Sequence, residues 1–284
     1  MILPALCTLV YFAQPATPPA ALAPAPPARP VPSAPAALAP RPAEPSAPPV
    51  SPPTAPPVVL PAVVPEGAGL KEVFPGVRLD ARAKLVEFDA VISPMLIKDD
   101  RAPNFFLEVL ACSFNTREHE TLVVTRVKPS HLHAALLAIG LKPGSPGSWT
   151  LKDGKLVATE PTGDRVSVRF LYALKDSPAA EHDPLNWIIS SRDKRGFVDA
   201  MNKAGPAIGF VFAGSRFVAR GDKAVYDADG AGNVIGLTTF GSEVIGLSRV
   251  ISPDASVESP QWIVDFSKTP PADTKVHVRV APAG

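Results

Sequence analysis

Proline is distributed unevenly along this chain, and that distribution limits which part of it can fold. Twenty-one of the 36 prolines lie in the first 65 of the 284 residues, among alanine, valine and serine. Proline fixes φ and lacks an amide donor, so neither a helix nor a sheet ladder can propagate through this spacing. We expect residues 14–65 to form a disordered Pro/Ala-rich spacer of polyproline II character, with a reach on the order of 150 Å.

The spacer has a second interpretation. Proline-rich segments also serve as ligands for proline-binding domains, which usually require a basic residue beside the prolines. Arg29 and Arg41 are the only basic residues in this part of the chain. The ligand interpretation therefore rests on these two arginines, whereas the spacer interpretation needs only the proline-rich composition.

An uncharged apolar run precedes the spacer. Residues 2–13 are too few to cross a bilayer as a helix but fit the apolar segment of a secretory signal. No Lys or Arg comes before the run, and Tyr11 is bulky where a cleavage site prefers a small residue. Three interpretations remain: a cleaved signal peptide over 1–13, a start site placed too far downstream, and a lipid anchor at Cys7. The first predicts an exported protein, periplasmic or in the cell envelope, with no transmembrane span.

Residues 66–284 have the composition of a globular domain. They carry 26 basic and 26 acidic side chains, a balance that predicts neither nucleic acid nor an anionic membrane as the main partner. A domain of this length can bury roughly 70% of the surface of its unfolded chain. Cys112 is its only cysteine, so the domain must rely on its core rather than on an internal disulfide.

Alternation with a period of two predicts that strands dominate the domain. It is clearest over 165–174 and 275–280, where apolar side chains mostly alternate with charged or polar ones, so that His277 is expected to face solvent. Further strands are predicted over 84–92, 104–112, 120–127, 208–219, 233–240 and 261–266. Turns are predicted at Asp153-Gly154, Gly163-Asp164, Gly221-Asp222 and Asp229-Gly230.

One principal helix is predicted, over about 129–140. Pro129 suits a first helical position and Gly140 a C-terminal stop. An apolar stripe at helical spacing joins Leu132, Ala135, Leu136 and Ile139. A weaker helix is expected over 194–203. The predicted fold is therefore α+β, a mainly antiparallel sheet with the principal helix on one face or edge.

The densest group of reactive side chains lies between Cys112 and His133. Cys112, His119 and His133 offer a thiolate and two imidazoles, which suit a single Zn, Cu or Fe ion with a carboxylate or water completing the site. His131 and His133 are two residues apart and cannot face the same direction in a regular helix. At most one of these two is expected to join His119.

The same residues also have a structural interpretation. Cys112 then fills a small space in the core, and His131 lies on the surface. Arg117 forms an ordinary surface ion pair with Glu118 or Glu120. Trp149, Trp187 and Trp262 are scattered and are expected to pack rather than to stack on a base or sugar.

Several segments, taken in order, resemble the YdjY-like family of bacterial proteins. They are Arg117 to Leu122, Pro129 to Gly140, Lys142 to Pro146, Phe210 to Ser215, Tyr226 to Leu237 and Pro270 to Pro282, so the resemblance covers most of 85–284. It implies no defined biochemical activity. The positions that it carries over are Glu118, His119, Glu120 and His133, with His131 less constant.

Some members of that family are described as ferredoxin-like iron–sulfur proteins. Four thiolates normally hold such a cluster, and Cys112 alone cannot. The chain therefore departs from that description, and no iron–sulfur cluster held by four cysteines is expected.

The segment 227–238 has part of the pattern of a calcium-binding EF-hand loop. Positions 1, 3, 6 and 8 of the loop match, but Ala231 and Thr238 replace two ligands, including the bidentate glutamate. The flanking residues have the pattern of strands. A glycine-rich hairpin turn is therefore expected here.

Together these patterns predict an exported, YdjY-like binding or structural module on a proline-rich spacer, more in keeping with binding than with catalysis. Its partner is expected to be an unknown protein or another envelope component, and not a nucleic acid. The alternative is a metal-binding or redox protein that uses Cys112, His119 and His133.

Overall fold

The computed structural model describes residues 69–284, except for 100, 102–103, 175–176, 255 and 258–260. The signal predicted over 1–13 and the spacer predicted over 14–65 lie outside the described residues. Within the described part, strands dominate and the helices are few and short, as the alternation predicts.

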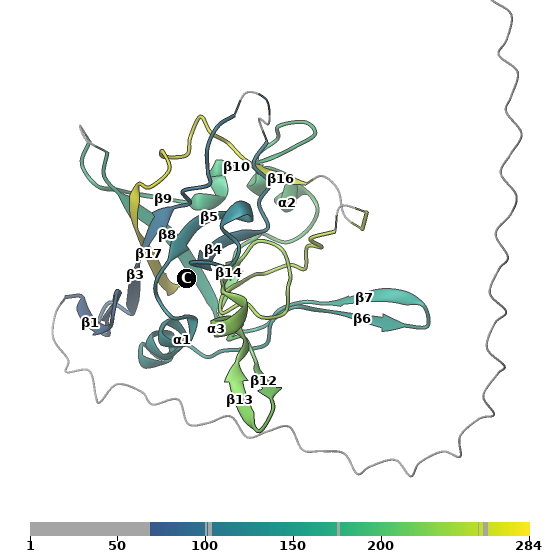
Figure 1. The fold of residues 1–284 in the computed structure, drawn as a ribbon, viewed down its shortest axis with the longest axis horizontal. Coiled ribbons are helices and arrows are strands. Elements are labelled where there is room, and N and C mark those ends of the chain that lie inside the picture. Colours follow the sequence, from purple (N-terminus) through teal and green to yellow (C-terminus); the bar gives the residue numbers. More distant parts are fainter. Residues whose placement is uncertain (1–68, 100, 102–103, 175–176, 255, 258–260) are drawn as a thin grey trace, which may run out of the picture. The chain divides into compact units, whose positions relative to one another are not determined.

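Eleven strands of the described chain form one curved, mixed sheet (Figure 1). Along its main path the order is β14-β4-β5-β3-β17-β8-β11-β15, while β1 and β2 extend it beside β3, and β9 pairs with β8. The bounds are Lys71–Phe74 (β1), Val77–Asp80 (β2), Leu85–Ile92 (β3), Val109–Ser113 (β4), Thr121–Thr125 (β5), Arg165–Tyr172 (β8), Ala180–His182 (β9), Phe210–Val211 (β11), Asn233–Gly236 (β14), Gly246–Leu247 (β15) and Lys275–Pro282 (β17). All of these pairs are antiparallel except β4 with β5.

Three pairs of strands stand apart from the main sheet. They are β6 (Ser148–Lys152) with β7 (Lys155–Thr159), β10 (Ile188–Ser190) with β16 (Trp262–Val264), and β12 (Phe217–Arg220) with β13 (Lys223–Tyr226). Figure 1 shows that β6–β7 and β12–β13 project from the body as separate hairpins. The turns predicted at Asp153-Gly154 and Gly221-Asp222 close these two hairpins.

The principal helix is α1 (Pro129–Ala138), with Pro129 at its start and Gly140 at φ 87° after its end. This confirms the predicted helix, although it is slightly shorter than expected. Its apolar stripe is buried, and the helix packs against β2 and β3. The second helix, α2 (Phe197–Lys203), begins three residues later than predicted. Short 3₁₀ turns cover Glu118–Glu120 and Pro184–Trp187.

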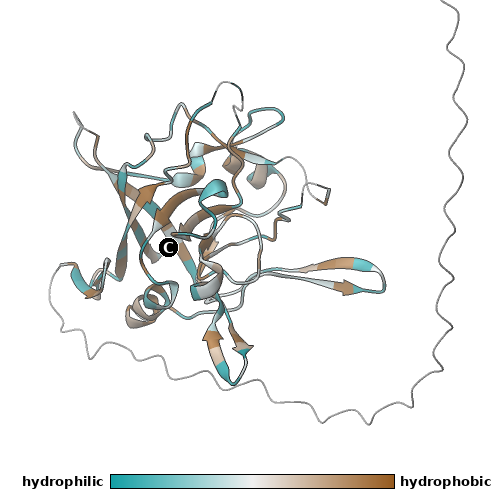
Figure 2. Cartoon of the chain, in the orientation of Figure 1, coloured by the Kyte–Doolittle hydropathy of each residue, from teal (hydrophilic) through white to brown (hydrophobic). Residues whose placement is uncertain are grey.

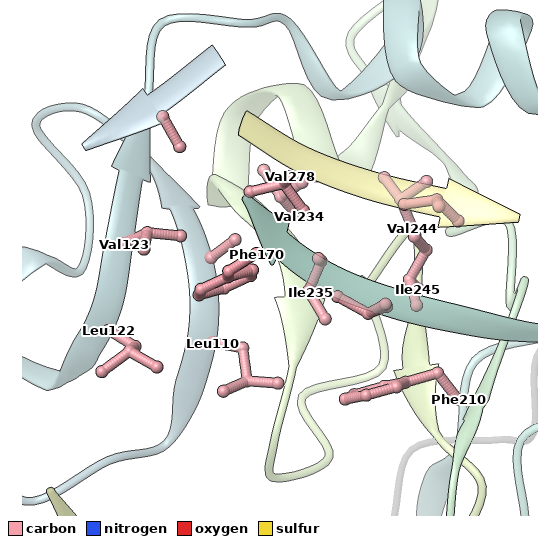
Figure 3. Packing of buried hydrophobic residues seen from close by; sticks show 14 of the residues in the cluster. Leu110, Leu122, Val123, Phe170, Phe210, Val234, Ile235, Val244, Ile245 and Val278 are labelled. Carbon is pink, nitrogen blue, oxygen red and sulfur yellow. The ribbon is translucent and has the colours of Figure 1, made fainter. Parts of the chain in front are cut away.

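The core lies against the centre of the sheet, where β3, β17 and β8 run side by side. Val278 of β17 pairs with Phe88 on one side and with Phe170 on the other, and all three side chains are completely buried. Figure 3 shows Phe170 and Val278 packed with apolar side chains from β4, β5, β11 and β14. Burial of each such side chain stabilises the fold by about 1.5 to 3 kcal/mol.

The other side of the same strands carries a ladder of charges. Glu87 bonds Arg78 Nε at 3.0 Å through one oxygen and Arg279 Nε at 2.8 Å through the other. His277 lies 3.0 Å from Asp89 Oδ1 and is about half exposed. This arrangement confirms that the period of two separates a core face from a polar face, with His277 on the polar one.

The structure corrects several strand boundaries and two turns. No turn forms at Gly163-Asp164, where Gly163 makes an antiparallel bridge to Pro143. The strand predicted over 208–219 is split into β11 and β12, because Gly214 and Ser215 adopt φ of 82° and 53°, outside the extended range. The strands predicted over 104–112 and 233–240 are shorter than expected, at Val109–Ser113 and Asn233–Gly236.

The hairpin turn predicted at Asp229-Gly230 is wrong. These residues form a short helix, α3 (Asp227–Ala231), that ends where Gly232 adopts φ 76° and its amide bonds to Ala228 O. A Cβ on Gly232 would lie 2.4 Å from Thr116 Oγ1, so glycine is needed here for both conformation and space.

Candidate functional site

The loop between β4 and β5 carries several of the residues that the sequence singles out. Because these consecutive strands are parallel, with Val109 opposite Thr121, the chain must return along β4 before β5 begins. Residues 114–120 make this return. The residue before β5, Glu120, therefore lies beside the residue before β4, Glu108, and the Glu108 amide donates to Glu120 O at 3.0 Å.

Glu108 and Glu120 form a carboxyl pair at the end of these strands. Glu120 accepts a hydrogen bond from Arg117, whose guanidinium lies 4.0 Å above the ring of Phe240. Burial, and then the adjacent charge of Glu120, raises the pKa of Glu108 to about 7. The pair can therefore bind a proton at neutral pH, which is the property of a general acid or base.

His119 and Glu118, which precede Glu120 in the sequence, have different roles. His119 is exposed, and its Nε2 lies 3.7 Å from Glu120 Oε2. Glu118 turns back on its own loop, where its carboxylate accepts the amides of Asn115 and Thr116. Glu118 thus stabilises the loop, and only His119 and Glu120 of the predicted cluster lie together.

His133 lies elsewhere, buried between α1 and the chain around β13. Its Nδ1 is 2.8 Å from Tyr226 Oη, and Tyr226 Oη donates to Gly214 O at 3.0 Å. Since a phenol has one proton, His133 Nδ1 is the donor to Tyr226. Burial lowers the pKa of His133, which favours the neutral form of the ring. The His133 ring also makes a T-shaped contact with the Phe212 ring, with the centroids 5.0 Å apart.

Cys112 is fully enclosed on β4. It packs with Val109 and Val124, and burial raises the pKa of its thiol. His131 stacks on Phe74 with ring centroids 4.4 Å apart. These contacts agree with the structural interpretation of both residues.

In the part of the chain that the structure describes, no group of three or more His, Cys, Asp or Glu side chains is placed to hold a metal ion. The buried Cys112, the exposed His119 and the Tyr226-bonded His133 each have separate surroundings. The structure therefore does not assemble the ligand set proposed from the sequence for a Zn, Cu or Fe ion.

The residues of the calcium-like segment also diverge. Asp227 pairs with Arg216 Nε at 2.8 Å, while Asp229 accepts from the Ser130 amide and hydroxyl, both at 2.8 Å. Asp229 therefore caps the first turn of α1 from another part of the chain. A surface pocket of about 420 Å³ lies beside these residues. Its walls are Lys128, Arg220, Val225, Tyr226, Asp227, Asp229 and Gly230.

A different feature, the β6–β7 hairpin, exposes several large apolar side chains. We call residues 148–159 the arm. Its strands pair Trp149 with Ala158 and Leu151 with Leu156 on one side, because alternate residues share a face. The side chains of Leu151 and Leu156 are large and apolar, yet they are 73% and 51% exposed. Figure 2 shows hydrophobic segments on both strands of the arm, away from the body.

The root of the arm is fixed tightly to the domain. Gly147 is buried, and a Cβ there would lie 2.8 Å from Thr239 Cγ2. At the other end, Glu160 accepts the Val250 amide at 2.7 Å. An isolated two-stranded hairpin is only marginally stable in water, so this root holds the arm in its projecting position.

Sequence reasoning missed both Glu108 and the apolar pair Leu151–Leu156. The Asp153-Gly154 turn signals a hairpin, but nothing in its sequence shows that the body leaves it uncovered. Trp187 and Trp262 are buried as expected, with ring contacts to Phe170 and Phe197, whereas Trp149 is half-buried on the arm.

The described residues contain no helix with the length and apolar character needed to cross a bilayer. Residues 77–281 match the YdjY domain family, as the resemblance predicts. No curated protein and no solved structure matches the chain.

Proposed function

We propose that this chain, which belongs to the YdjY domain family, is an exported binding module of the cell envelope that contacts its target through the arm. The apolar run over 2–13 and the proline-rich residues 14–65 support export and a spacer between the domain and its point of entry. The target is a protein or another envelope component.

One observation carries the binding role. The arm exposes Leu151 and Leu156 side by side, at a distance from the core that could cover them. Scattered exposed leucines are normal, but a paired apolar surface on a projecting element is typical of an interaction site. Two unpaired strand edges flank it, and such edges bind other elements unless they are protected.

Fractionation of the producing cells tests this proposal. In one variant of the full chain, residues 148–159 are replaced by a short Gly/Ser linker that joins Gly147 to Glu160. We expect the wild-type chain to sediment with the envelope fraction and the armless chain to be released, with the same urea midpoint for both. Equal retention of the two chains in the envelope fraction would refute the role of the arm.

The carboxyl pair favours a second role, which is proton binding near neutral pH. Glu108 lies beside Glu120 and Arg117, Glu120 in turn lies 3.7 Å from the exposed His119, and the pKa of Glu108 is raised to about 7. Carbon-detected NMR of the glutamate carboxyls should give an apparent pKa near 7 that disappears in Glu108→Gln. A titration in which every carboxyl has an ordinary value would eliminate this role.

A further inference from the structure

We propose that the arm docks on an anionic lipid surface, with Leu151 and Leu156 entering the headgroup region and Lys152 and Lys155 binding lipid phosphates. This inference rests on the proposed function, because it specifies which envelope component the arm contacts. It is argued from the arrangement of charge and apolar surface along the arm.

The end of the arm combines two cations with an apolar pair. Lys152 and Lys155 are directly opposite one another, in the pair that follows Leu151–Leu156. Because alternate residues share a face, the lysines lie on the other face of the hairpin from the leucines, and their long stems must reach around to the phosphates while the leucine face enters the headgroup region. Like charges opposite one another destabilise a hairpin, and Asp153 in the turn is the one acidic residue between them. Anionic headgroups would relieve this repulsion while the leucines leave water.

The whole domain is electrically balanced, so its net charge gives no attraction to an anionic membrane. The arm differs from the domain. Residues 148–159 contain two lysines and one aspartate, all within the four residues 152–155 at its end. Attraction to a charged surface falls off within about 10 Å at moderate salt, so a projecting end responds to its own charges more than to those of the body.

A second hairpin in the same chain provides an internal comparison. The β12–β13 hairpin also ends in two opposed cations, Arg220 and Lys223, around a Gly221-Asp222 turn. The next pair there is Ala219–Ala224, where the arm has Leu151–Leu156. The two hairpins therefore match in charge at their ends and differ in the apolar pair, which only the arm can insert.

Two other occupants fit less well. A second copy of the chain could cover the apolar face, but four side chains on each arm are far fewer than the roughly 20 to 30 residues a side of a stable interface. Deep insertion is also disfavoured, because the open strand edges would lose water inside the hydrocarbon region. A lipid surface covers the face while the edges stay at the level of the hydrated headgroups.

Vesicle sedimentation tests the proposal with four forms of the full chain, all of which share residues 1–68. They are wild type, Leu151→Ser/Leu156→Ser, Lys152→Ser/Lys155→Ser and the matched control Arg220→Ser/Lys223→Ser. The vesicles contain three parts phosphatidylcholine and one part phosphatidylglycerol, or phosphatidylcholine alone.

We expect the lysine variant to bind the anionic vesicles about 25-fold more weakly than wild type, since each lysine near such a surface contributes about fivefold. The leucine variant should lose at least about tenfold. The control variant should bind like wild type, and wild type should bind phosphatidylcholine alone only weakly.

Three results would overturn the lipid proposal. One is equal binding of all four forms, which would assign the binding to residues outside the arm. Another is an equal loss in the control variant, which would indicate unspecific attraction of surface cations. The third is arm-dependent retention in the envelope fraction without arm-dependent binding to vesicles, which would leave the proposed function intact and identify the target as a protein or another non-lipid envelope component.

Discussion

Replacement of Tyr226 by phenylalanine tests how His133 is held. The substitution removes one hydroxyl from a buried site where it bonds His133 Nδ1 at 2.8 Å and Gly214 O at 3.0 Å. Each bond contributes about 1 kcal/mol net, and a buried polar group left without a partner costs about 1 to 3 kcal/mol. Because the ring can shift its proton to the other nitrogen, we expect a total loss of about 2 kcal/mol.

Urea unfolding of the full chain, followed by far-UV circular dichroism, measures this loss. The midpoint should fall while the slope of the unfolding free energy with urea stays unchanged. Tyr172→Phe is the matched control, because Tyr172 is partly exposed and stacks on His182 through its ring, which the variant keeps. A loss below about 0.5 kcal/mol for Tyr226→Phe, equal to that of the control, would refute the hydrogen-bonded role of His133.

Three further outcomes follow from the described contacts. Folding raises the pKa of Glu108 from 4.5 to about 7, so the stability that its bound proton contributes is fully present below pH 4.5 and is lost as the pH rises through 7. In Glu108→Gln, the free energy of unfolding should therefore change less between pH 5 and 8, by about 1 kcal/mol after allowance for solvent screening. An unchanged pH profile would contradict the raised pKa. Gly232→Ala should lower the unfolding free energy by about 2 kcal/mol or more, since the new Cβ meets Thr116 at positive φ, and a neutral result in urea unfolding would show that the loop can move. Leu151→Ser/Leu156→Ser should change the unfolding free energy by less than about 0.5 kcal/mol, because both side chains are exposed; a larger loss would mean that the arm packs on the body.

The sequence predicts the elements whose pattern depends on their own residues. The strands β8 and β17 alternate along most of their length because each has one face in the core and the other toward solvent. Helix α1 is signalled by its own proline, stripe and glycine. The local sequence does not predict elements that are fixed by distant contacts. Helix α3 ends on Gly232, where the chain passes close to Thr116, a residue far away in the sequence.

The site was less predictable than the fold for the same reason. Glu108 joins Glu120 only because β4 and β5 are parallel, and local alternation does not reveal strand direction. His133 finds its partner Tyr226 on β13, 93 residues later. The apolar residues of the arm have an ordinary strand pattern, and their exposure depends on what the rest of the chain leaves uncovered.

Hydrogen exchange of the arm tests the central claim most directly. Amides of residues 148–159 are compared between the free full chain and the same chain bound to the envelope fraction, with the β12–β13 hairpin as an internal reference. The account predicts slower exchange in the arm on binding and unchanged exchange in the β12–β13 hairpin. Unchanged exchange in the arm of the bound chain would show that another surface makes the contact.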